Sequence, residues 1–268
     1  EQYQTKMVDR IVKWIKDYTN ENSISSLVVG VSGGIDSALV STLCAKTGIP
    51  THCVLMPIHQ HPDHTTRGLN HVRWLQKNHE LVGLHEFDLT EVYDKFVESM
   101  QYASSKLGFA NSRSRLRMVT LYQLATTVNG LVVGTGNKVE DFGIGFYTKY
   151  GDGGVDISPI ADLTKTEVYQ LAKELGINEE IIVAPPTDGL WDDTRNDEDQ
   201  IGATYPELEW AMDFVKENWY WEQGMESEGF LDYDEEKLTS RERVVLDIYQ
   251  SFHRKNKHKM KPIPVFRK

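Results

Sequence analysis

Residues 30–37 read Gly-Val-Ser-Gly-Gly-Ile-Asp-Ser, and this stretch decides the fold. An apolar run, Leu27-Val28-Val29, precedes it and a helix-like stretch, residues 38–45, follows it, which predicts a strand, a glycine turn and a helix start. N–H groups at a helix N-terminus have no intrahelical acceptor and lie at the positive end of the helix dipole. Gly33 and Gly34 would let an anion approach the main chain. The stretch therefore predicts a phosphate site in a protein that handles a nucleotide.

The spacing of the glycines does not fit two common nucleotide-binding loops. Gly-x-x-x-x-Gly-Lys-Ser/Thr does not occur here, and Gly30, Gly33 and Gly34 do not fit Gly-x-Gly-x-x-Gly. Residues 32–37 instead resemble the pyrophosphate loop of the N-type ATP pyrophosphatases, which cut ATP into AMP and pyrophosphate. This resemblance implies that ATP is bound by Gly30, Val31, Ser32, Gly33, Gly34, Ile35, Asp36 and Ser37.

Composition limits the class of protein. The 268 residues carry a net charge of −11, which argues against broad nucleic-acid binding. No apolar run approaches the roughly 18 residues that cross a bilayer, and the first residues lack a signal-peptide pattern. Cys44 and Cys53 lie in apolar contexts and are expected to be buried thiols, which fits a reducing cytoplasm. Because no Pro/Gly/Ser-rich linker divides the chain, we expect one domain over residues 1–268. From the thiols and the lack of a signal-peptide pattern, we expect it in the cytoplasm.

Apolar strands alternate with helices along the chain. We predict strands at 27–29, 52–56, 81–87 and 131–133, and helices at 7–18, 38–45, 63–78, 91–107 and 111–129. This alternation predicts an α/β fold, a doubly wound parallel sheet flanked by helices. With the strand order 3-2-1-4, the turn 30–37 and the glycine-rich turn 134–137 would face one another across a crevice at the carboxyl ends of the strands.

Three later segments are also informative. Thr164 and Glu167 have capping-box spacing before a helix that Gly176 ends, so Thr164 is expected to be a cap. Residues 185–202 show little periodicity, which is typical of a lid, a binding loop or disorder. Thr239 is expected to cap a last helix.

Four motifs together resemble the NAD synthetase family. They are residues 30–37, Asn-Ser-Arg-Ser-Arg-Leu-Arg at 111–117, Gly-Thr-Gly-Asn-Lys-Val-Glu at 134–140, and Phe-Tyr-Thr-Lys-Tyr-Gly-Asp-Gly-Gly-Val-Asp at 146–156. The first motif is shared with GMP synthetase, asparagine synthetase and tRNA-modifying enzymes, whereas the last is far more specific. The resemblance covers nearly the whole chain and implies a Rossmann-like fold of the adenine nucleotide alpha hydrolase type.

The resemblance implies one reaction. The carboxylate of deamido-NAD would attack the α-phosphorus of ATP, pyrophosphate would leave, and ammonia would displace AMP from the acyl-adenylate to give NAD. The family uses Mg²⁺, and hydrogen-bond donors and cations on the departing pyrophosphate suit this chemistry. Gly136-Asn137-Lys138 differs from the Asp-His-Ala often found in the short ammonia-using enzymes. The chain has no room for a glutaminase domain, so we expect ammonia that is free or supplied by a separate partner.

The resemblance also assigns ATP and metal contacts. Asp36 and Glu140 match the Mg²⁺ ligands, and Thr135, Lys165 and Thr187 match ATP contacts. Asp36 could instead cap its helix, Glu140 could be an exposed loop glutamate, and the two threonines could be turn hydroxyls. Lys165 could be an ordinary lysine on a solvated face, but it would then oppose the helix dipole. We expect Asp36 and Lys165 to act in catalysis.

Dinucleotide contacts follow from the same motifs. On a helix, Arg113 and Arg117 share a face and Arg115 points away, and the family motif places the contact at Arg115. The other matching positions are Lys149, Asp156, His258 and Lys259. Arg115 could instead be a solvated arginine, and His258 and Lys259 could belong to a frayed basic tail.

Asp152 is the third residue expected to act in catalysis. It could hold ammonium beside the acyl-adenylate, or it could simply form a turn within Gly151-Asp152-Gly153-Gly154. The family forms homodimers whose interface helps bind the dinucleotide, so we expect a homodimer. The alternatives are another ATP pyrophosphatase, such as the synthetase half of GMP synthetase or a tRNA thiolase, and a nucleotide-binding module without catalysis.

Overall fold

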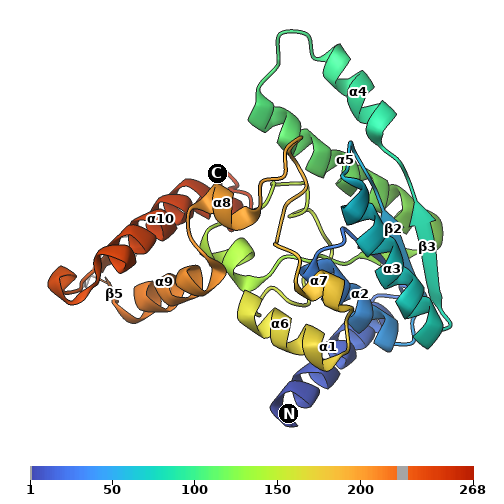
Figure 1. Cartoon of the computed structure of the whole chain (residues 1–268), viewed down its shortest axis with the longest axis horizontal. Coiled ribbons are helices and arrows are strands. Elements are labelled where there is room, and N and C mark those ends of the chain that lie inside the picture. The colour runs from blue at the N-terminus through green and yellow to red at the C-terminus, as the bar shows by residue number, and fades with distance from the viewer. Residues whose placement is uncertain (1, 222–228) are drawn as a thin grey trace.

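A four-stranded parallel sheet organises the protein. The computed structural model describes residues 2–221 and 229–268 (Figure 1). The sheet has the order β3-β2-β1-β4, as predicted. The strands are β1 (Ser26–Gly30), β2 (Thr51–Leu55), β3 (Val82–Glu86) and β4 (Gly130–Val132).

Helices cover both faces of the sheet. The strand side chains alternate between the two faces and are apolar on each, so both faces must be buried. One face packs on α1 (Gln2–Glu21), α2 (Ile35–Lys46), α3 (Pro62–Asn78) and α6 (Lys165–Glu174); the other packs on α5 (Lys106–Val128), which α4 (Thr90–Ser99) precedes. Leu27 and Val29 belong to the core shared with α1, α2 and α6, whereas Val28 contributes to the core under α5. The predicted α/β class is confirmed.

A helical arm extends from this body, at the left of Figure 1. It consists of α9 (Tyr205–Glu217) and α10 (Ser240–Asn256), which pack on each other. Short elements join it: η1 (Val139–Gly143), η2 (Glu235–Lys237), η3 (Lys257–Lys259) and the antiparallel pair β5 (Trp219–Trp221) and β6 (Gly229–Leu231). The apolar core of the arm includes Val139, Leu208, Val245 and Tyr249.

Two parts of the chain differ most from the sequence prediction. The helix predicted over 91–107 ends at Ser99, and the helix predicted from 111 begins at Lys106. The cause is Ser105, whose side chain accepts a hydrogen bond from the Gly108 N–H and caps the new helix. The stretch 185–202, predicted without regular structure, contains α8 (Asp197–Ile201), while α7 (Glu179–Ile182) precedes it.

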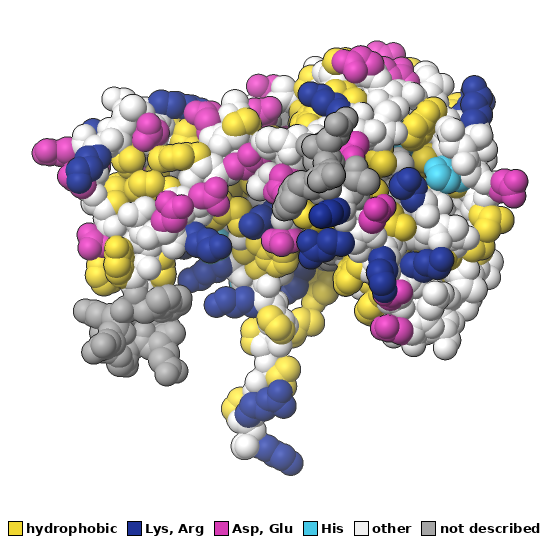
Figure 2. Space-filling view, turned by 90° about the horizontal axis from the view of Figure 1, so that it is seen from below, with side chains coloured by type: hydrophobic (Ala, Val, Ile, Leu, Met, Phe, Trp, Pro, Cys, Tyr) yellow, Lys and Arg dark blue, Asp and Glu magenta, His cyan; other side chains and the backbone are white. Residues whose placement is uncertain are grey.

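Several other predictions are confirmed. Thr164 and Glu167 form the capping box of α6, and the Thr239 side chain caps α10. Cys44 and Cys53 are buried free thiols. Across the described residues we find no helix with the length and apolar character needed to cross a membrane. On the face drawn in Figure 2, acidic and basic side chains are interspersed.

Candidate active site

A cavity of about 250 Å³ lies at the carboxyl ends of β1 and β4. Its walls include the loop 30–37, the turn 134–136 and the stretch 184–190. The structure thus brings together all of the predicted ATP, metal and catalytic residues: Gly30 to Ser37, Thr135, Glu140, Asp152, Lys165 and Thr187. The two glycine turns face this common space, as the strand order required.

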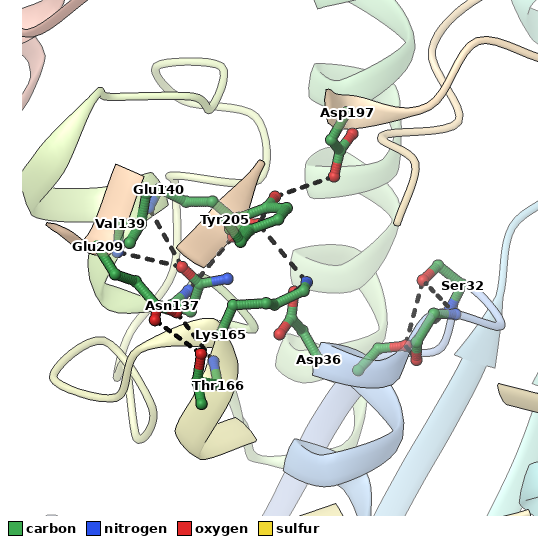
Figure 3. A network of polar contacts seen from close by, with 12 residues as sticks. Ser32, Asp36, Asn137, Val139, Glu140, Lys165, Thr166, Asp197, Tyr205 and Glu209 are labelled. Carbon is green, nitrogen blue, oxygen red and sulfur yellow. Dashed lines mark hydrogen bonds and ion pairs between the residues drawn. The ribbon is translucent and has the colours of Figure 1, made fainter. Parts of the chain in front are cut away.

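The loop 30–37 is held open by its own hydrogen bonds. Ser37 Oγ accepts from the Ser32 N–H at 3.1 Å, and the Gly34 N–H donates to Ser32 Oγ at 3.2 Å (Figure 3). Gly33 has φ +86°, and a Cβ there would lie 2.5 Å from the His64 carbonyl oxygen. Gly34 is the N-cap of α2 and makes no side-chain cap hydrogen bond. The first N–H groups of α2 therefore remain available to an anion.

A buried ion pair lies beside this loop. Lys165 Nζ is 2.6 Å from Asp36 Oδ2 and 4.0 Å from Glu140 Oε1, and its side chain is only 4 % exposed. Burial alone opposes its charge, but Asp36 and Glu140 outweigh that effect and raise the lysine pKa. The alternative of a lysine on a solvated face is therefore wrong, because α6 turns its first residue inward.

The two carboxylates around Lys165 are also buried. Asp36 bonds Lys165 rather than capping α2, and its Oδ1 is buried without a hydrogen-bond partner among the described residues. Glu140 is 14 % exposed, so it is not an exposed loop glutamate. Its oxygens accept from the Asn137 N–H at 3.3 Å and from the Tyr205 hydroxyl at 2.9 Å. Burial, and then the charge of Asp36, raise the pKa of Glu140 well above its usual range.

The carboxylates of Asp36 and Glu140 suit a metal cation whose remaining ligands are water and substrate oxygens. Lys165 is a cation held between Asp36 and Glu140, which shows that the two carboxylates converge on positive charge. Within residues 2–221 and 229–268, no three His, Cys, Asp or Glu side chains form a complete metal cluster. Mg²⁺ is usually bound by one or two carboxylates together with water and substrate phosphates, so this arrangement suits it.

The sequence reasoning missed four further residues of the site: Arg117, Asp141 and Asp197, which line the cavity, and Tyr205, which contacts Glu140 from behind the lining. Arg117 lines the cavity and donates to the Met56 carbonyl and to Gln60. Burial, with Asp152 and Asp36 nearby, raises the pKa of Asp141 to about 7. A Cβ on Gly136 would lie 2.2 Å from Asp141 Oδ1, so the glycine makes room for that carboxylate. Of the four, only Arg117 lay in a motif that pointed to a ligand.

Asp152 and Thr187 line the cavity and also make the turn contacts that were the alternative. Asp152 Oδ1 accepts from the Thr148 N–H at 2.7 Å and from the Ser114 hydroxyl at 3.1 Å. The Thr187 hydroxyl donates to the Arg195 carbonyl at 3.2 Å. Each side chain thus has a structural role in the wall of the site.

The predicted dinucleotide residues do not line this cavity. Arg115 points away from the Arg113 face, as predicted, and donates to the Lys149 carbonyl at 3.1 Å. Asp156 accepts from the Tyr122 hydroxyl, and Lys259 Nζ donates to the Gly145 and Tyr147 carbonyls. The fifth predicted residue, His258, is exposed in η3.

Comparisons with known proteins show the family of this chain. The NAD synthase family model matches residues 7–262. The chain is 40% identical over 207 residues to the NH(3)-dependent NAD(+) synthetase of Carboxydothermus hydrogenoformans, covering 75% of this chain and 82% of the relative. It is 33% identical to that of Methanosarcina mazei, covering 96% of each. The solved NMN synthetase of Francisella tularensis superposes with a TM-score of 0.82 at 28% identity, covering 98% of each chain. With the family model matching residues 7–262 and relatives up to 42% identical over most of their length, this chain belongs to the NAD synthase family.

Proposed function

We propose that this protein catalyses the ATP-dependent amidation of deamido-NAD by ammonia, giving NAD, AMP and pyrophosphate, the last step of NAD biosynthesis. The observation that carries the proposal is the buried group of Lys165, Asp36 and Glu140 beside the phosphate loop in one cavity. Curated relatives at 33–42% identity are named as enzymes of this reaction. A noncatalytic nucleotide-binding module would not need to bury such charges.

The residues of the cavity suit the first half of the reaction. A carboxylate is a poor electrophile, so it attacks the α-phosphorus of ATP and forms an acyl-adenylate as pyrophosphate leaves. Negative charge accumulates on the leaving group, and the open N–H groups at the start of α2 lie where they can bind it. Lys165, held charged by its two carboxylates, supplies a cation that needs no proton transfer during the step.

Asp36 and Glu140 would hold Mg²⁺ against the phosphates. The free Oδ1 of Asp36 is the strongest support, since a buried carboxylate oxygen without a partner is costly unless a cation or donor reaches it. When bound, Mg²⁺ would neutralise charge on the departing pyrophosphate. The chain's own contribution is to orient the two carboxylates through the Lys165, Asn137 and Tyr205 contacts.

Ammonium would bind near Asp152 in the second half of the reaction. Asp152 is fixed by two hydrogen bonds and faces the same cavity as the phosphate loop. Its carboxylate would attract the ammonium ion, which would lose a proton to solvent. The neutral ammonia would attack the acyl carbon, the bond to AMP would break, and a second proton would pass to solvent as the amide forms.

Deamido-NAD would extend beyond the cavity. We assign its outer contacts to Arg115, Lys149, Asp156, His258 and Lys259, which lie outside the cavity lining. A second copy of the chain would complete this outer site in a homodimer. The Arg115 side chain donates to the backbone carbonyl of Lys149, which joins the second and fourth motifs in this outer region.

One assay tests the proposal. The protein is incubated with ATP, Mg²⁺ and ammonium and with deamido-NAD, nicotinic acid mononucleotide or xanthosine monophosphate, and AMP and the amidated product are measured. Equal amounts of AMP and NAD with deamido-NAD are expected. The mononucleotide is the second candidate, because the Francisella tularensis structure is named as an NMN synthetase and covers the whole chain. AMP formation that depends on xanthosine monophosphate, or no turnover, would refute the proposed function.

A further inference from the structure

Tyr205 joins two parts of the site that are separate in the sequence. Its ring is 2% exposed at the start of α9, and its hydroxyl lies 2.9 Å from Glu140 Oε1 and 3.1 Å from Asp197 Oδ2 (Figure 3). Lys165 Nζ lies 4.8 Å from the centre of the same ring. Tyr205 thus contacts a proposed metal ligand, the buried lysine and a residue of the stretch 185–202.

The stretch 185–202, named here the covering segment, is itself a closed unit. The Asp197 N–H donates to the Pro186 carbonyl at 2.8 Å, which brings the two ends of the segment together. At its far side, Asp192 pairs with the guanidinium of Arg113 on α5. Asp197 is 5% exposed, so its bond to Tyr205 is a buried polar attachment of the segment, and Ile201 adds an apolar one in the core of the arm.

A single hydroxyl hydrogen cannot serve both carboxylates at once. Glu140 and Asp197 Oδ2 therefore compete for it, and Asp197 Oδ1 has no hydrogen-bond partner in the described chain. A cation bound at Glu140 would satisfy that carboxylate and leave the hydrogen for Asp197. The bond to the covering segment would then strengthen.

We propose that Tyr205 is a positioning residue that links the cation at Glu140 to the order of the covering segment. The proposal rests on the proposed function for the presence of Mg²⁺ and ATP at this site. Linkage is reciprocal, so a bound cation tightens the segment and a fixed segment favours the cation. The segment forms one wall of the cavity, so this link would close the site only when the metal and nucleotide are in place.

Limited proteolysis tests the link without measuring turnover. Trypsin can cut after Arg195, whose side chain is 39% exposed in the covering segment. ATP with Mg²⁺ is expected to slow this cut in the parent protein by about five-fold or more, the lower end of typical coupling. Tyr205→Phe keeps the ring and removes the hydroxyl, so the protection by Mg²⁺ should be lost. ATP with EDTA should affect both proteins alike.

Two further variants serve as a control and as an independent test of the link. Tyr249→Phe is the matched control, because Tyr249 is buried in the same core and, in the described chain, no hydrogen bond joins it to Glu140 or Asp197. It should be protected like the parent. Asp197→Ala leaves Tyr205 in place and should lose protection as Tyr205→Phe does, which guards against a folding defect of the tyrosine variant.

Activity adds an independent readout. Tyr205→Phe should raise the Mg²⁺ concentration for half-maximal amidation about ten-fold or more, as for other groups that orient a metal ligand. The proposal is overturned if Mg²⁺ protects the parent no better than EDTA, or protects Tyr205→Phe or Asp197→Ala as well as the parent. If no NAD is formed but protection differs as expected, the proposed function fails and the link stands.

Discussion

Replacing Lys165 by methionine should strongly destabilise the ligand-free protein. Methionine keeps the length of the side chain and removes its charge, so Asp36 remains buried beside Glu140 without the cation that compensates its negative charge. The Nζ to Oδ2 distance is 2.6 Å, and the two side chains are 4% and 16% exposed, so solvent screens this pair little. Removal of one partner from a buried pair typically costs about 3–5 kcal/mol.

Thermal unfolding measures this cost. For a chain of this size, each kcal/mol corresponds to roughly 2–4 °C, so the Tm should fall by about 6–20 °C. Circular dichroism in EDTA at one protein concentration is the assay. Lys173→Met is the matched control, because Lys173 is exposed on the same helix and its loss should cost no more than about 0.5 kcal/mol.

A double variant separates charge from packing. Lys165→Met with Asp36→Asn removes both members of the pair and should recover part of the lost stability, since one uncompensated charge is gone. Equal Tm values for Lys165→Met and Lys173→Met would refute the reasoning, because the ion pair would then behave as a surface pair.

Three other predictions concern the same cavity. Gly33→Ala should weaken ATP binding and lower stability in thermal and binding assays, since φ is +86° and the added Cβ would meet the His64 carbonyl at 2.5 Å; unchanged ATP affinity would contradict this. Asp152→Asn should raise the apparent KM for ammonium more than that for ATP, and an unchanged ammonium KM would exclude the ammonium role. Asp141 and Asp197 have pKa values raised to about 7, mainly by burial, so the native state holds more protons than the unfolded state below that pH. Ligand-free stability should therefore fall as pH rises from about 5 to 7, and the pH dependence of Tm should be flatter in Asp197→Asn.

The sheet could be predicted because its signals are local. Strands such as Leu27-Val28-Val29 are buried on both faces and therefore apolar throughout, and the glycine loop follows directly. The strand order then placed the loop 30–37 opposite the turn 134–136. Helix boundaries were less predictable, because the cap at Ser105 competes with an equally helical neighbouring sequence.

The centre of the site depended on tertiary packing and was only partly predictable. Lys165 was recognised through a family resemblance, but its burial follows from how α6 packs against α2. Tyr205 contacts Glu140, and Asp197 contacts Tyr205, from elements that no motif marks as functional. Their roles come from distances across the fold, which hydrophobic periodicity cannot encode.

The close approach of Gly136 and Asp141 has a consequence for the sequences that this cavity can accept. A side chain at 136 and the present carboxylate at 141 cannot occupy the same space, because the distance would be 2.2 Å. A sequence with a larger residue at 136 and aspartate at 141 would therefore need the carboxylate to turn to another position in the cavity. Exchanging residue 136 alone between relatives should displace the Asp141 carboxylate from its present place.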